Sequence, residues 1–223
     1  MSLPRMLTAA LTVATLSFAA LSAGSAAAQD PPGFGDNNRA RPTGTPFVLP
    51  EGLELTIVSY NPFDPDGCKR PGAEPDEEPL PVQGHVTGQV NLCFKFKNDT
   101  RVRINTTLPP GLVTVTDQWQ NQNGLVFESV DLEVPAEQEL YSPFKADCMN
   151  SSLSAPGPGI PYEVAVVTDN RHIREALGLM AGADLSDPMV SATASMLMKP
   201  LYKGKPLTND TRRQLMELPR RQS

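Results

Sequence analysis

Histidine, tryptophan and cysteine are scarce in this chain of 223 residues, which contains two, one and three of them. His85 and His172 have no second histidine or carboxylate at metal-ligand spacing, so we expect both to be surface residues rather than zinc ligands. The G-x-S-x-G motif is absent, which together with the shortage of histidine argues against a Ser-His-Asp hydrolase. We therefore expect a protein that is not an enzyme, with no catalytic residue and no cofactor.

Long apolar runs are also missing, except for one at the start of the chain. Arg5 precedes an apolar stretch over residues 6–21, and Ser25-Ala26-Ala27-Ala28 follows it. A charged start, an apolar middle and small residues at the end are the pattern of a secretory signal peptide. We expect residues 1–28 to be this peptide, with cleavage after Ala28. The mature protein would then be periplasmic or secreted and would have no transmembrane segment.

Charge is unevenly distributed over the rest of the chain. Residues 199–223 contain seven basic and two acidic residues, whereas residues 29–198 contain 11 basic and 23 acidic residues. This basic tail could dock on its own acidic body, or on an envelope protein, an anionic surface polymer or lipid headgroups. Nucleic acid is not an expected partner, because the acidic body would repel it and the tail lacks interleaved aromatic residues.

The central part of the sequence has the alternation of β-strands. Residues 29–46 are rich in proline, glycine and asparagine and are predicted to form a flexible leader. Between residues 47 and 167, six or seven short apolar runs are separated by turn signals, including Asn123-Gly124. In the clearest run, Leu92, Phe94 and Phe96 share one face, and Cys93 lies on the other. This pattern predicts an antiparallel, immunoglobulin-like β-sandwich.

Helical signals begin only after residue 167. Thr168 is a possible cap for a helix ending near Gly182, and Asp187-Pro188 is a cap followed by proline at the first helical position. The second helix should end before Pro200, and Thr208 should cap a third. Residues 168–223 are thus predicted to be a short helical segment that carries the basic tail.

The three cysteines allow three pairings in an oxidising compartment. Cys93 and Cys148 both lie in predicted strands, so we slightly favour a Cys93–Cys148 disulfide. This pairing needs a bulge or a bridge on the outer face of the sheet, because Cys93 is on the polar face. Cys68 lies in a loop and could instead fold back onto Cys93.

Two features suggest weak metal sites. The loop at residues 61–81 contains an Asp-x-Asp-Gly fragment of the calcium-loop pattern, although the full pattern is missing. Its candidate ligands are Asp64, Asp66, Glu74 and Asp76. Several methionines are concentrated in the predicted helices and could bind Cu(I), although core filling is the commoner role of methionine. These are Met180, Met189, Met196, Met198 and Met216.

Taken together, these patterns favour an exported, non-catalytic binding or structural module of the bacterial periplasm or cell envelope. A periplasmic protein that binds calcium or copper is the first alternative. An enzyme of unrecognised type is the second.

Overall fold

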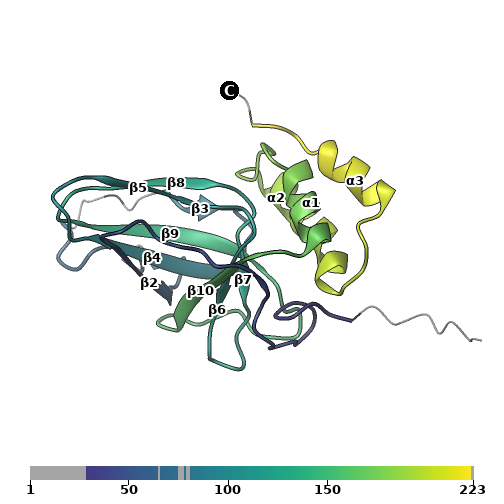
Figure 1. Cartoon of the computed structure of the whole chain (residues 1–223), viewed down its shortest axis with the longest axis horizontal. Helices are drawn as coiled ribbons and strands as arrows, with labels where there is room; N and C mark the ends of the chain where they lie inside the picture. The colour runs from purple at the N-terminus through teal and green to yellow at the C-terminus, as the bar shows by residue number, and fades with distance from the viewer. Residues whose placement is uncertain (1–28, 65, 75–77, 79–80, 222–223) are drawn as a thin grey trace, which may run out of the picture.

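The computed structural model describes residues 29–64, 66–74, 78 and 81–221, and six of its strands close into an antiparallel barrel (Figure 1). The closed path runs β10–β2–β4–β9–β7–β6 and returns to β10. Its strands are β2 (Leu53–Ser59), β4 (Val90–Asn98), β6 (Leu112–Val115), β7 (Gly124–Leu125), β9 (Glu139–Cys148) and β10 (Pro161–Thr168). The predicted immunoglobulin-like sandwich is therefore wrong, since a sandwich consists of two separate sheets.

Two long strands close the barrel by changing partners along their length. β10 pairs with β2 through Pro161 and Tyr162, and with β6 from Glu163 onward, with a register shift between Val164 and Val166. β9 pairs with β4 over most of its length and with β7 at its end. The alternation of apolar residues is the same in a barrel and in a sandwich, so the sequence pattern did not distinguish them.

Four further strands of the described residues lie outside the barrel path. β1 (Gly44–Thr45) pairs with β10, and β3 (Gln83–Gly84) runs parallel to β9. β5 (Ile104–Leu108) and β8 (Val130–Val134) form a separate antiparallel ribbon along one side of the barrel (Figure 1). The buried apolar residues of this ribbon, Leu108, Val130 and Val134, join the same core cluster as Leu92, Phe94 and Phe96.

The three helices of the described residues gather at one end of the barrel (Figure 1). α1 (Arg171–Leu179) is capped by the Asn170 side chain rather than by Thr168. α2 (Pro188–Tyr202) has the predicted Asp187 cap but continues through Pro200, and α3 (Asn209–Met216) has the predicted Thr208 cap. A second core forms where these helices cover strands β6 and β7, which is why every residue of β6 is buried.

The segment 29–46 lies against the body and is not a free leader. Phe34 is buried in the helical core, where its ring is 5.6 Å from that of Tyr202. The backbone carbonyl of Gly33 accepts hydrogen bonds from the side-chain amides of Asn123 and Asn150. These contacts could not be predicted from the sequence, because a single buried aromatic residue produces no periodic pattern.

None of the helices in the described part of the chain combines the length and the apolar character needed to cross a membrane.

Candidate functional site

A group of polar side chains joins the barrel to α2. Asp147, near the end of β9, is buried and accepts three hydrogen bonds from α2. The donors are the hydroxyl of Ser195 at 2.6 Å, Nζ of Lys199 at 3.1 Å and the hydroxyl of Tyr202 at 2.6 Å. These positions are four and three residues apart, so one face of the helix presents all three donors to one carboxylate.

His85 and Ser191 extend this network, and both are fully buried. Nδ1 of His85 is 3.1 Å from Oγ of Ser191, and Nε2 is 3.6 Å from Oδ1 of Asp147. Burial lowers the pKa of His85 to about 4, although the charge of Asp147 opposes this shift. His85 is therefore neutral at pH 7, and the negative charge of Asp147 favours the tautomer with its proton on Nε2. The prediction that His85 is a surface residue is wrong.

Although a serine, a histidine and an aspartate meet here, the arrangement is not that of a hydrolase. In a catalytic triad the serine contacts Nε2 and the aspartate orients Nδ1, whereas here the two contacts are exchanged. Oγ of Ser191 also accepts a hydrogen bond from the backbone N–H of Thr87, and it lies 2.7 Å from the hydroxyl oxygen of Thr87. Since Ser191 is fully buried, its hydroxyl has no access to a substrate. The network fastens α2 to the barrel.

Cys148 follows Asp147 in β9 and also contacts Lys199. It is the free cysteine, it is buried, and burial raises the pKa of its thiol. Lys199 lies beside it and donates to its backbone carbonyl at 2.8 Å. A reactive cysteine needs a lowered thiol pKa and solvent access, so Cys148 is not a suitable nucleophile.

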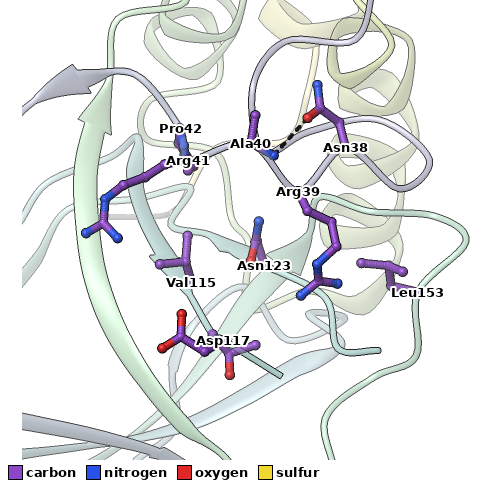
Figure 2. A pocket seen from close by; sticks show the side chains of 10 residues that line it. Asn38, Arg39, Ala40, Arg41, Pro42, Val115, Asp117, Asn123 and Leu153 are labelled. Carbon is purple, nitrogen blue, oxygen red and sulfur yellow. Dashed lines mark hydrogen bonds between the residues drawn. The ribbon is translucent and has the colours of Figure 1, made fainter. Parts of the chain in front are cut away.

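An open pocket of about 150 Å³ lies between the segment 38–42 and the end of β6 (Figure 2). Arg39 and Asp117, both exposed, border it with charges of opposite sign, and Val115 and Leu153 add apolar surface. The guanidinium of Arg39 donates to the backbone carbonyls of Gln118, at 3.0 Å, and Trp119. These hydrogen bonds connect the segment 38–42 to the loop after β6 at the edge of the pocket.

The acidic loop does not form a metal site among the residues that the structure describes. Asp64 accepts the backbone N–H of Asp66 in a local turn, and Asp66 forms an ion pair with Lys69 at 3.1 Å. Asp76 lies outside the described residues. In the described part of the chain, Glu74 included, no three His, Cys, Asp or Glu side chains are grouped so that they could hold an ion.

The expected disulfide is present but joins Cys68 to Cys93, so the favoured Cys93–Cys148 pairing is wrong. Cys93 does point away from the barrel core, as its parity predicts. It is buried there because the loop after β2 folds over it, and Cys68 and Tyr60 pack against it. Cys148 is near Gly124 and cannot reach the outer face of β4.

The basic tail docks on the body of its own protein. Lys199 pairs with Asp147, Lys203 with Asp36 at 2.7 Å, Arg212 with Glu175 at 2.6 Å, and Arg221 with Glu128 at 2.7 Å. Arg213 pairs within α3 with Asp210, and Arg220 donates to backbone carbonyls at the end of α1. Most of the positive charge that could attract an anionic surface is therefore already paired.

These features could be recognised only in part from the sequence. Ser195, Lys199 and Tyr202 recur at a spacing of four and three residues, which places them on one face of α2. Asp147 lies in a strand of mixed polar and apolar residues and does not stand out in the sequence. The positions of His85 and Arg39 depend on long-range folding and have no local signal. Comparisons with protein-family models, curated protein sequences and solved structures find no match to this chain.

Proposed function

We propose that this protein is an exported, non-catalytic binding module that recognises an envelope protein through the Arg39–Asp117 pocket. One contrast carries the proposal. The side chains most suited to catalysis are buried and occupied in joining α2 to the barrel, whereas Arg39 and Asp117, which line the proposed pocket, are exposed. A surface with both charges and some apolar area suits a peptide segment, which offers polar and apolar groups together.

Two further observations support this interpretation. A disulfide is typical of proteins in oxidising compartments, in agreement with the signal-like start of the sequence. The ion pairs of the basic tail favour a protein partner over an anionic polymer or headgroup, because the tail's cations are used within the molecule.

Affinity capture from an envelope extract with matched variants tests the proposal. A partner that binds the wild type should be lost with Asp117→Ala and retained with Asp131→Ala, which removes another exposed carboxylate, from the β5–β8 ribbon. Equal capture by both variants would place the binding surface elsewhere. Turnover of an envelope substrate that disappears in folded Ser191→Ala would overturn the non-catalytic interpretation.

A further inference from the structure

A second pocket lies at the junction of the barrel and the helices, away from the Arg39–Asp117 pocket. Its volume is about 250 Å³. The inner wall consists of Phe127, which follows β7, together with Leu177 of α1 and Met180, which follows that helix. Exposed Ala181 and Gly182 form part of the rim. The lining is therefore mainly apolar inside and open at the edge.

The C-terminal segment 219–221 positions a charged group at this rim. The backbone N–H of Asp184 donates to the carbonyl of Pro219 at 2.9 Å, and that of Arg221 donates to the carbonyl of Gly182 at 3.0 Å. The Arg220 side chain adds hydrogen bonds to the carbonyls of Leu179 and Met216. Arg221 is consequently held beside the pocket by backbone contacts.

Arg221 forms an ion pair with Glu128, which also lines the pocket, and Nη2 of the arginine lies 2.7 Å from Oε2 of the glutamate. The arginine side chain is 57% exposed, so solvent screens this pair and it contributes little to stability. A guanidinium has five N–H donors and is suited to bidentate binding of a carboxylate. A carboxylate that enters the pocket can therefore replace Glu128 at Arg221.

We propose that this junction pocket binds a small organic acid, with its apolar body against Phe127, Leu177 and Met180 and its carboxylate on Arg221. An apolar cavity of about 150 Å³ is large enough for benzene, so this pocket has room for an aromatic ring with a short chain. The charge of Arg221 selects the acid over a neutral compound of the same shape. Ligand sites commonly combine an apolar lining with a few polar groups at a boundary between structural units.

The test is titration of the full chain with 3-phenylpropionate, followed by NMR of isotope-labelled methionine methyl groups. Saturable shifts are expected for Met180, which lines the pocket, and not for Met189, which is exposed on α2. The neutral analogue 3-phenylpropanol should bind about tenfold more weakly, because it lacks the charge-assisted hydrogen bonds.

Three variants and one control distinguish the parts of the proposal. Arg221→Ala should weaken binding of the acid about tenfold, while Arg213→Ala, which removes another exposed and paired arginine, should leave it unchanged. Glu128→Gln should strengthen binding, because it removes the competing carboxylate. Ala181→Phe should block the rim without disturbing the core.

Two outcomes would overturn the proposal. Absence of a saturable Met180 shift in the wild type would mean that the pocket does not bind the acid. Equal affinity for the acid and the alcohol, unaffected by Arg221→Ala, would show that the arginine does not select the ligand. Neither outcome affects the proposal for the Arg39–Asp117 pocket, whose test uses different residues and a different ligand.

Discussion

At the scale of single residues, Asp147 has several side-chain partners, most of them on α2. Its buried carboxylate is surrounded by Ser195, Lys199 and Tyr202 from α2 and faces His85 from the other side. A buried carboxylate is costly unless hydrogen bonds satisfy it, and here the helix supplies them. Asp147 therefore couples α2 to the barrel, and replacing its side chain should lower the stability of the protein.

Asp147→Asn should lower the free energy of unfolding by about 3 kcal/mol. The amide has one acceptor oxygen, so its NH₂ group must face at least one of the three donors, and the ion pair with the partly exposed Lys199 is lost as well. Urea unfolding measures the change. Asp131→Asn, on the exposed side of the ribbon, is the control and should change stability by less than about 0.5 kcal/mol. Equal effects at both sites would contradict the structural role of Asp147.

His85 should make stability depend on pH in a definite direction. Its pKa is about 4 in the folded state, against 6.5 for an unperturbed histidine, so the unfolded chain binds the extra proton first as pH falls. Stability is therefore greatest above pH 6.5 and decreases towards pH 4, by roughly 3 kcal/mol from this group. Unfolding curves of His85→Gln should lack this part of the pH dependence. His172→Gln, which changes a partly exposed histidine, should retain it.

At the scale of elements, the strand and helix signals of the sequence were mostly sufficient to predict where strands and helices form. The parity of β4 placed Leu92, Phe94 and Phe96 in the core, and Asp187 and Thr208 cap helices as predicted. The predicted end of α2 was wrong, because Pro200 is inside the helix. A proline there leaves one carbonyl without its usual N–H donor, and burial of Leu201 and Tyr202 offsets this cost. A local rule was overridden by tertiary packing.

Pro200→Ala should therefore stabilise the protein, by about 1 kcal/mol. Alanine restores the missing backbone donor and favours the helix, while a gain in unfolded-chain entropy removes part of the benefit. Thermal and urea unfolding report the difference. Pro188→Ala is the matched control: proline is favourable at the first helical position, so its removal should bring no gain. A loss of stability with Pro200→Ala would mean that the proline is required for the geometry of the helix end.

At the scale of the whole molecule, the way the strands and helices pack together could not be predicted from the local patterns that identify them. Closure of the barrel depends on β10 pairing with both β2 and β6, and the disulfide depends on a loop folding over Cys93. The two candidate pockets also combine distant segments: Arg39 and Asp117 line one, and Arg221 pairs with Glu128 at the other. Alternation and capping are local signals, whereas these contacts are determined by long-range pairing.

The segment before β1 provides the last test of this long-range organisation. Phe34 links it to the helical core that covers the barrel, so Phe34→Ala should reduce the free energy of unfolding by about 3 kcal/mol, as expected for a buried aromatic side chain. Phe63→Ala is the control, because the Phe63 side chain is 92% exposed and its loss should have little effect. Urea unfolding compares the two. If both variants were as stable as the wild type, residues 29–46 would be a dispensable leader after all. A selective loss with Phe34→Ala would show that this segment, the barrel and the helices fold as one unit.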